Sequence, residues 1–263
     1  MMAEDVGVRV VTWNVNSLRM RLPRVLQFLA EYRPDVACLQ ETKSLPDTFP
    51  VAELADAGYR AVHHSGGQWA GVALLARSEL ELSDPVLELA GDVAPAEARW
   101  CEATVAGVRF ASVYVPNGRA LGNPEFPRKL AFLDAVAGRV AALRDRDPLL
   151  LAGDMNIAPS DLDVYDPVAF AQSTHVSPQE RERLATILDL GLVDAYRRLH
   201  PGEVQYTWWD YRAGHFHKGL GLRIDLLLVA QARAADLQSC GIVREYRKGV
   251  KPSDHAPLLL ELG

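Results

Sequence analysis

The sequence predicts an α/β protein in which mixed β-sheets lie in the middle and helices cover them on the outside. Short apolar runs of strand length recur along the 263 residues, and segments with helical spacing of apolar residues separate some of them. Other runs follow one another too closely for a helix, so these neighbours must pair as antiparallel hairpins. Both kinds of connection in one chain give mixed rather than purely parallel sheets.

Eight runs are predicted to be strands. They are Val8 to Trp13, Val36 to Gln40, Gly71 to Ala76, Trp100 to Val105, Val108 to Val115, Pro148 to Ala152, Ile224 to Val229 and Pro257 to Leu262. Only Ala106 and Gly107 separate the fourth run from the fifth, which predicts a hairpin there.

Three segments have the apolar spacing of helices: Leu22 to Glu31, Phe126 to Leu143 and Pro178 to Asp189. Ser177 before Pro178 gives the last one a conventional start. The longest irregular stretch, Ile157 to Ser177, has enough aromatic and apolar residues to be ordered, and such loops are often functional. No linker or repeat divides the chain, so residues 1–263 are predicted to form one domain.

Composition narrows the class of protein. No apolar stretch approaches the roughly 20 residues of a membrane helix, and the first residues, including Glu4 and Asp5, do not resemble a signal peptide. Cys38, Cys101 and Cys240 lie in apolar surroundings without a CxxC pair, which indicates reduced, buried thiols. We therefore expect a cytoplasmic protein with no membrane association.

The net charge of −6 argues against binding to polyanions through bulk charge alone. A site rich in carboxylates can nevertheless hold a divalent cation, which then supplies the positive charge that a phosphate meets. The basic residues between Arg244 and Lys251 reverse the charge locally, although such a cluster can also be a solvated surface.

Polar side chains follow three of the predicted strands. Asn14 follows the first, Glu41 follows the second, and the tetrapeptide Gly153 to Asn156 follows the strand that ends at Ala152. Functional groups in α/β sheets gather beyond strand ends, so these residues indicate an active site, although Gly, Asp and Asn are also common in turns. Asp225 lies inside a later apolar run, where an acid needs a partner, such as Arg223, or a role.

Oxygen ligands of this kind suit Mg²⁺, which binds one or two carboxylates together with substrate phosphates. Zn²⁺ suits the sequence less well, because the pairs His63-His64 and His215-His217 fall in predicted loops and are more simply solvated histidines. The sequence also lacks a GxSxG nucleophile, a Walker A loop and a GxGxxG turn.

Seven segments, taken in order, resemble exonuclease III. They are TWNVNS (Thr12 to Ser17), LQETK (Leu39 to Lys43), VYVPNG (Val113 to Gly118), GDMNIAPSDLD (Gly153 to Asp163), TWWDYR (Thr207 to Arg212), LRIDLLL (Leu222 to Leu228) and KPSDHAP (Lys251 to Pro257). The resemblance implies the four-layer α/β/β/α sandwich of two mixed sheets shared with deoxyribonuclease I. It also implies a Mg²⁺-dependent abasic-site endonuclease of DNA repair.

The resemblance implies roles for individual residues. Asp154 would orient or deprotonate the attacking water, Asn156 would hold that water and the phosphate, and Tyr114 would contact the phosphate. His255 would contact the scissile phosphate, with Asp225 fixing its ring. The implied ligands of the cation, Mg²⁺ or alternatively Mn²⁺, are Asn14, Glu41, Asp154, Asn156, Asp254 and His255, with Glu41 the principal one.

Contacts to DNA are implied in the same way. Trp208, Leu222 and Ile224 would line the pocket for an abasic sugar, and Leu222 departs from relatives that carry tryptophan there. Core packing is the alternative interpretation of Trp208 and its neighbour Trp209. Contacts to the DNA backbone are expected from Lys43, Arg99, Asn117, Arg247 and Lys248.

The sequence therefore predicts a monomeric hydrolase that cleaves double-stranded DNA 5′ to abasic sites and also acts on 3′ ends. One alternative is a related phosphodiesterase acting on RNA, a lipid head group or an inositol phosphate. Another is a nucleic-acid-binding module of the same fold without catalysis. The complete set of acids, amides and histidine in one chain argues against the second.

Overall fold

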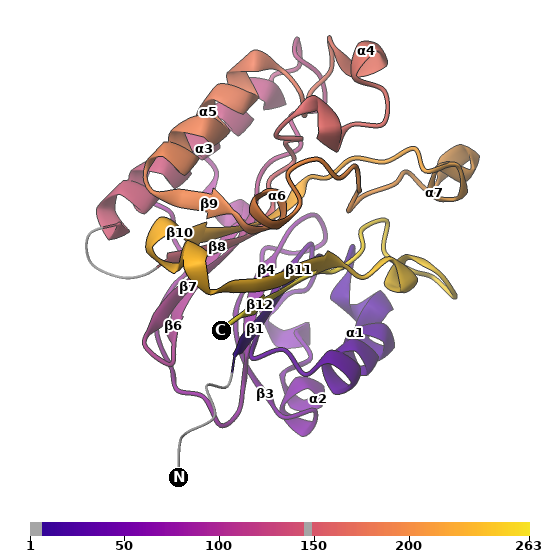
Figure 1. The fold of residues 1–263 in the computed structure, drawn as a ribbon. Coiled ribbons are helices and arrows are strands. Elements are labelled where there is room, and N and C mark those ends of the chain that lie inside the picture. The colour runs from indigo at the N-terminus through magenta and orange to yellow at the C-terminus, as the bar shows by residue number, and fades with distance from the viewer. Residues whose placement is uncertain (1–6, 145–148) are drawn as a thin grey trace.

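The computed structural model describes residues 7–144 and 149–263, and it contains two six-stranded sheets (Figure 1). The first sheet has the order β11 (Leu237–Ile242), β12 (Leu258–Leu262), β1 (Val8–Asn14), β2 (Val36–Gln40), β4 (Val72–Arg77) and β3 (Tyr59–His64). The second has the order β5 (Leu82–Val86), β6 (Trp100–Val105), β7 (Val108–Tyr114), β8 (Leu149–Asp154), β10 (Asp225–Ala230) and β9 (Leu192–Asp194). Strand pairs β1–β2 and β7–β8 are parallel and the others are antiparallel, so both sheets are mixed as predicted.

Helices cover the outer face of each sheet. Helix α1 (Leu18–Tyr32) and the short α2 (Val51–Asp56) share an apolar cluster with β1, β2 and β4, whereas α3 (Glu125–Leu143) and α5 (Pro178–Asp189) share one with β7, β8 and β10. Short helices α4 (Pro167–Phe170), α6 (Ala195–Leu199) and α7 (His215–Lys218) lie in the connections, together with 3-10 turns at Pro46–Thr48, Pro95–Glu97, Asp161–Asp163, Arg212–Gly214, Gln231–Asp236 and Arg244–Arg247. The predicted four-layer α/β/β/α sandwich is confirmed.

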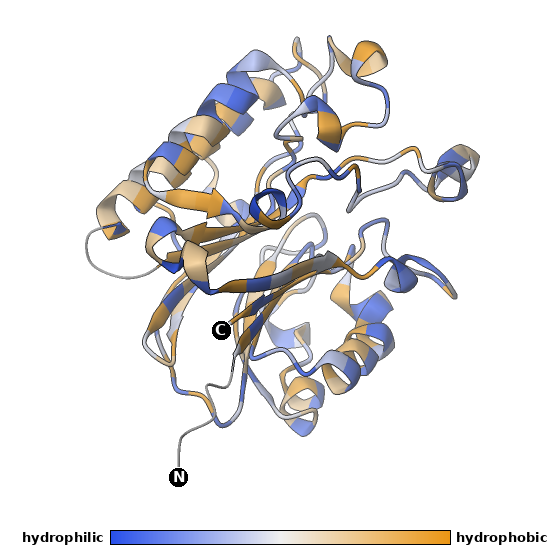
Figure 2. Ribbon diagram, viewed as in Figure 1, coloured by the Kyte–Doolittle hydropathy of each residue, from blue (hydrophilic) through white to orange (hydrophobic). Residues whose placement is uncertain are grey.

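A third apolar cluster lies between the two sheets. Val10 and Cys38 contribute to it from the first sheet, whereas their neighbours Val11 and Leu39 point to α1. Both faces of the central strands are thus buried, which explains why they appear in the sequence as continuous apolar runs rather than alternating ones. Figure 2 shows these apolar strands between helices with polar outer surfaces.

The predicted strands and helices are found at their expected bounds or within four residues of them, and Ala106 and Gly107 form the predicted hairpin turn with positive φ of 47° and 80°. Pro148, Glu4 and Asp5 lie outside the described residues. The prediction that the histidine pairs lie in loops was wrong: His63 and His64 end the edge strand β3, and His215 and His217 lie in α7.

The three cysteines are free and buried, as expected, and burial raises the pKa of the Cys101 thiol to about 12. Within the described residues, no helix is both long and apolar enough to cross a membrane. The first and last strands, β1 and β12, lie side by side, with Val8 opposite Leu262.

Candidate active site

Three adjacent strands of the second sheet place polar side chains in one row. Tyr114 at the end of β7 is paired in register with Asp154 at the end of β8, and Asp154 with Asp225 at the start of β10. Side chains of paired residues lie on the same face of a sheet, about 5 Å apart. The register of these strands therefore brings a phenol and two carboxylates together.

The first sheet supplies the other half of the site. Asn14 ends β1, Glu41 follows β2, and His255 precedes β12. The Asn14 amide donates from Nδ2 to Oε1 of Glu41 at 2.8 Å and to Oδ2 of Asp154 at 3.0 Å. One buried amide thus links carboxylates from the two sheets.

The loops at the site hold several residues in the left-handed region. Glu41 has φ of 51°, Asn156 of 49° and Asn16 of 43°. Non-glycine residues adopt this conformation at a cost of about 1–3 kcal/mol and persist there when surrounding contacts fix them. At Asn156, the backbone N–H donates to Oδ1 of Asp154 at 2.9 Å and the side-chain amide donates to the Val115 carbonyl at 2.9 Å.

His255 lies between two carboxylates. Its Nδ1 is 2.8 Å from Oδ2 of Asp225, and its Nε2 is 3.7 Å from Oδ2 of Asp154. Burial alone would lower the pKa of His255, but the charges of Asp225 and Asp154 outweigh it and raise the pKa to about 10. The two carboxylates therefore favour the protonated, positively charged ring, with Nε2 facing the site.

Asp154 is almost wholly buried, and its environment favours the protonated form. Burial, supported by the charges of Asp225 and Glu41, raises the pKa of Asp154 to about 7 against the opposing effects of His255 and Asn14. The pKa of Tyr114 is also well above its usual value, because of burial and then the charges of Glu41 and Asp154. Excess negative charge of this kind is relieved by a bound cation.

Glu41, Asp154 and His255 offer ligand atoms that all lie within 4.8 Å of one another. A second observation agrees with a cation: Oδ1 of Asp225 is buried and has no hydrogen-bond partner within the described residues. The three residues thus form a candidate divalent-metal site. The positive charge on His255 makes the two carboxylates the stronger ligands, because a metal-bound histidine must be neutral.

Asp254 lies outside this group of three. Its Oδ1 accepts from Nδ2 of Asn16 at 3.0 Å and its Oδ2 accepts from Nε1 of Trp208 at 3.1 Å. The interpretation of Asp225 as the ion-pair partner of Arg223 is not what the structure shows, because Arg223 pairs with Asp163 and Asp194.

The residues predicted to contact DNA lie on two sides of the site and differ in their exposure. Lys43 reaches Oε2 of Glu41 at 2.7 Å, and Arg99 stacks on the Tyr114 ring with 4.6 Å between guanidinium carbon and ring centroid. Arg99 and Asn117 line a cleft of about 480 Å³ beside Tyr114. On this side of the site Asn117 is exposed, and Lys43 and Arg99 are partly buried.

The predicted contacts on the other side are less accessible. Arg247 is only 7% exposed, stacks on Tyr211 and donates to the Trp209 carbonyl at 3.2 Å. Lys248 is exposed and pairs with Glu245. Leu222 and Ile224 are buried in an apolar cluster against which the half-buried Trp208 packs, whereas Trp209 is a core residue.

Sequence reasoning missed several residues of the site. Asn16 accepts from Nζ of Lys43 at 2.7 Å, and His175 places Nδ1 2.6 Å from the Asn156 carbonyl. Asn16 belongs to the segment TWNVNS, and His175 lies in the long loop from Ile157 to Ser177. Both could therefore have been identified as candidate site residues from the sequence. Lys129, the third, lies at a core position of α3 between Phe126 and Leu133.

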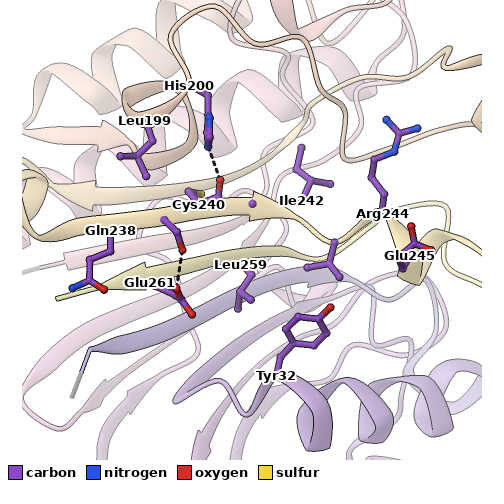
Figure 3. A pocket seen from close by; sticks show the side chains of 13 residues that line it. Tyr32, Leu199, His200, Gln238, Cys240, Ile242, Arg244, Glu245, Leu259 and Glu261 are labelled. Atoms are coloured by element: carbon purple, nitrogen blue, oxygen red, sulfur yellow. Dashed lines mark hydrogen bonds between the residues drawn. The ribbon is translucent and has the colours of Figure 1, made fainter.

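A larger cavity, of about 680 Å³, lies elsewhere, along the edge strand β11 (Figure 3). Its polar groups are engaged with one another: His200 contacts the Cys240 carbonyl at 2.9 Å, and Ser239 donates to Glu261 at 2.9 Å. The His200 contact occupies one backbone acceptor of the edge strand, whereas the Ser239 contact joins two side chains, and neither brings carboxylates together as the strand ends do. The site at the strand ends is therefore the better candidate.

A sandwich of two mixed sheets with buried carboxylates and a histidine at the strand ends defines a phosphodiester hydrolase, and its polar residues include a candidate site for a divalent metal. Residues 11–255 match the model of the endonuclease/exonuclease/phosphatase family. The chain belongs to this family, and within it to the nucleases of the exonuclease III and AP endonuclease type.

Individual relatives are similar to this chain over nearly its whole length. Exodeoxyribonuclease III of Haemophilus influenzae is 31% identical, with 97% of this chain and 99% of the relative covered. The structure of the Neisseria 3′ phosphatase NExo bound to a product DNA hairpin has a TM-score of 0.95 at 40% identity, covering 97% of this chain and 99% of that one. An AP endonuclease from Archaeoglobus fulgidus has a TM-score of 0.91 at 33% identity, with 97% and 99% covered.

Proposed function

We propose that this protein is a Mg²⁺-dependent DNA repair hydrolase that cleaves the phosphodiester bond 5′ to an abasic site in duplex DNA. The observation that carries the proposal is the buried arrangement of Asp154 between Asn14 and the His255 cation. It places a proton acceptor and a positively charged donor on either side of one small space. Both kinds of group accelerate the hydrolysis of a phosphate ester.

In this proposal Asp154 accepts a proton from the attacking water. Burial raises the pKa of Asp154 in the metal-free protein, and a bound cation would lower it, which keeps the carboxylate ionised and able to accept the proton. Asn156 holds the water through its side-chain amide, one hydrogen of which is engaged by the Val115 carbonyl. His255 donates from Nε2 to a phosphate oxygen, because Asp225 engages Nδ1 and fixes the ring.

Glu41 and Asp154 would hold the metal, and Mg²⁺ is the proposed ion because it prefers carboxylates and phosphate oxygens. When bound, the ion supplies positive charge to the phosphate and its leaving group. Mn²⁺ has a similar preference for oxygen ligands. The partly buried cationic residues beside the site, Lys43 and Arg99, would then contact the DNA backbone.

A cleavage assay tests the proposal. The purified protein is incubated with a duplex that carries one tetrahydrofuran abasic analogue, with Mg²⁺ or with EDTA. We expect a nick on the 5′ side that requires the metal. Glu41→Gln is expected to need more Mg²⁺ for the same rate, and absence of any metal-dependent nick would refute the assignment.

Hydrolysis at 3′ ends is the second candidate function. The identity of 40% to the Neisseria 3′ phosphatase exceeds the 33% to the AP endonuclease from Archaeoglobus fulgidus. In addition, Leu222 and Ile224 are covered by other side chains, so an extruded abasic sugar must first open their cluster. Hydrolysis at a 3′ terminus would not require an extruded sugar to enter this cluster.

The two candidates are separated with three duplexes of one sequence. One carries the abasic analogue, one a nick with a 3′ phosphate, and one a recessed, unmodified 3′ end. If kcat/KM is highest on the 3′ phosphate, end processing is the principal activity. If kcat/KM is highest on the intact strand with the abasic analogue, incision at abasic sites is the principal activity.

A further inference from the structure

Lys129 is a buried cation beneath the active-site loops. It occupies a core-facing position of α3, and its side chain has 0% exposure. Its ammonium donates to the Asn156 carbonyl at 2.6 Å, to the Asn117 carbonyl at 3.3 Å and to the Thr174 hydroxyl at 3.4 Å. Its fourth contact is a short ion pair with Glu180.

Glu180 belongs to the first turn of α5 and is also fully buried. Besides Lys129, its Oε1 accepts from the backbone N–H of His175 and from the hydroxyl of Thr174, both at 2.9 Å. Its Oε2 accepts from the N–H of Ser177 at 3.0 Å and closes the capping box of the helix. The carboxylate thereby fixes the end of the long loop that began at Ile157.

Three loop segments therefore meet at one ion pair. They carry Asn117, Asn156 and His175, whose side chains and backbone also contact one another. Asn117 donates to Oδ1 of Asn156 at 3.3 Å, and Nδ1 of His175 lies 2.6 Å from the Asn156 carbonyl. The segment around Gly118, with φ of 81°, packs so closely on Lys129 that a Cβ there would lie 3.0 Å from its Cδ.

The stability of the fold alone does not explain a buried ion pair such as Lys129 and Glu180. Replacing a buried ion pair with apolar side chains of similar size is often neutral or stabilising, because desolvation of the two charges is costly. An apolar pair would, however, give the Asn156 carbonyl no ammonium donor. Asn156 is held in the left-handed region, and its side chain lies beside Asp154, so its backbone orientation matters for the site.

We propose that Lys129 and Glu180 are positioning residues for hydrolysis: their ion pair fixes the backbone of Asn156, and thereby the amide that holds the water and phosphate beside Asp154. The inference rests on the proposed function. Neither residue touches the reacting atoms. Their effect is expected on the rate of the chemical step rather than on DNA binding.

The test uses the double variant Lys129→Met with Glu180→Gln, which removes both charges together and leaves neither unpaired. Its control is Arg109→Met with Glu102→Gln, another buried ion pair, which the partly exposed Arg139 also joins; Arg109 lies near the start of β7, and Tyr114 is its last residue. We measure kcat and KM on the best of the three duplexes, DNA affinity, and Tm. Removing a supporting contact of this kind costs about 10–100-fold in activity.

We expect kcat of the Lys129/Glu180 double variant to fall about 10–100-fold. Its KM and DNA affinity should stay within about threefold of wild type. The control is expected to keep its kcat even if its Tm falls as far. An unchanged kcat in the folded Lys129/Glu180 variant would overturn the inference, and so would equal kcat losses in both double variants.

The single variants sharpen the result. Glu180→Gln keeps the ammonium donor to the Asn156 carbonyl, so it is expected to lose less kcat than Lys129→Met, and the reverse order contradicts the inference. If wild type cleaves none of the DNA substrates, the proposed function fails on its own. Crystal structures then decide the positioning role, because Asn156 at an unchanged φ in the double variant would overturn it.

Discussion

Burial, and then the charges of Asp225 and Glu41, raise the pKa of Asp154, because little water reaches the carboxylate to screen them. The Asn14 amide and the His255 cation offset part of that rise. The ionised form of a carboxylate is less stable in such surroundings than it is in water. Sites of this kind combine reactivity with a stability cost.

Asp154→Asn is expected to lower kcat by about 10²–10⁴-fold, the usual contribution of a positioned general base. DNA affinity should remain, because the amide keeps the shape of the carboxylate. Single-turnover cleavage and fluorescence anisotropy measure the two quantities. Asp161→Asn, at an exposed carboxylate paired with Arg181, is the matched control and should keep full activity. Joint loss of affinity, activity and fold would assign Asp154 a structural role instead.

The same substitution is expected to stabilise the metal-free protein above neutral pH. The pKa of Asp154 is about 7 in the folded state against 3.8 in the unfolded chain, so folding takes up a proton between these values. The carboxylate therefore costs nothing below pH 3.8 and progressively more as the pH rises to 7. At about 1.4 kcal/mol per pKa unit the full cost is up to about 4 kcal/mol.

Urea unfolding in EDTA at pH 5 and pH 8 measures this difference. The stability gain of Asp154→Asn over wild type should be larger at pH 8 than at pH 5. A gain that does not grow with pH would show that the carboxylate is not the source of the cost.

Much of this site was predictable residue by residue, because Asn14, Glu41, Asp154 and His255 lie next to apolar runs that sequence patterns reveal. Their proposed roles remain predictions. The contacts of Lys129 and His175 were not predictable, because they depend on how α3 and α5 place loops that are distant in sequence.

Strand β8 shows how an element serves the site. Gly153 precedes Asp154 and lies opposite Val113 of β7. A Cβ at Gly153 would lie 2.0 Å from the Val113 carbonyl oxygen, a clash with backbone that no side-chain movement relieves. Only glycine allows β7 and β8 to approach this closely where Tyr114 and Asp154 meet.

Gly153→Ala is therefore expected to destabilise the fold by about 1–3 kcal/mol or more and to reduce activity, because β8 must shift. Gly138→Ala in α3 is the matched control: a Cβ there meets open space, and alanine favours a helix by about 0.5–1 kcal/mol. Denaturant unfolding of both variants gives the comparison. Equal stability of the two would contradict the close approach.

The strands that sequence patterns missed are β3, β5, β9 and β11, which are the edges of the two described sheets. Edge strands carry polar and charged residues and proline, as in the LSDPV of β5, because one side of each lacks a partner strand. The central strands were found because burial on both faces requires continuous apolar residues. Sequence thus predicted the middle of each sheet and the hairpin, but not where the sheets end.

At the scale of the whole molecule, the site joins the two sheets. Glu41 follows β2 of the first sheet, and Asp154 ends β8 of the second. A cation held by both carboxylates would therefore bind only the folded arrangement. Ligands with that preference stabilise proteins by about 2.7 kcal/mol at a hundredfold excess over Kd.

Added Mg²⁺ is expected to raise the Tm of the wild-type protein and to do so far less in Glu41→Gln. Differential scanning calorimetry against Mg²⁺ concentration measures both shifts. Glu31→Gln, at a carboxylate bonded to Tyr246 away from the site, serves as the control and should respond as wild type does. Equal shifts in wild type and Glu41→Gln would mean that Mg²⁺ acts elsewhere.

The pairing of Tyr114, Asp154 and Asp225 across three strands has one more consequence, for the fidelity of folding. Slipping a strand by one residue turns all its side chains to the opposite face. A molecule with β8 misaligned by one position would present Gly153 or Met155 where the carboxylate belongs, while its apolar residues could still collapse into a compact particle. Specific activity would then count only the correctly aligned molecules in a preparation, which spectroscopic measures of secondary structure cannot do.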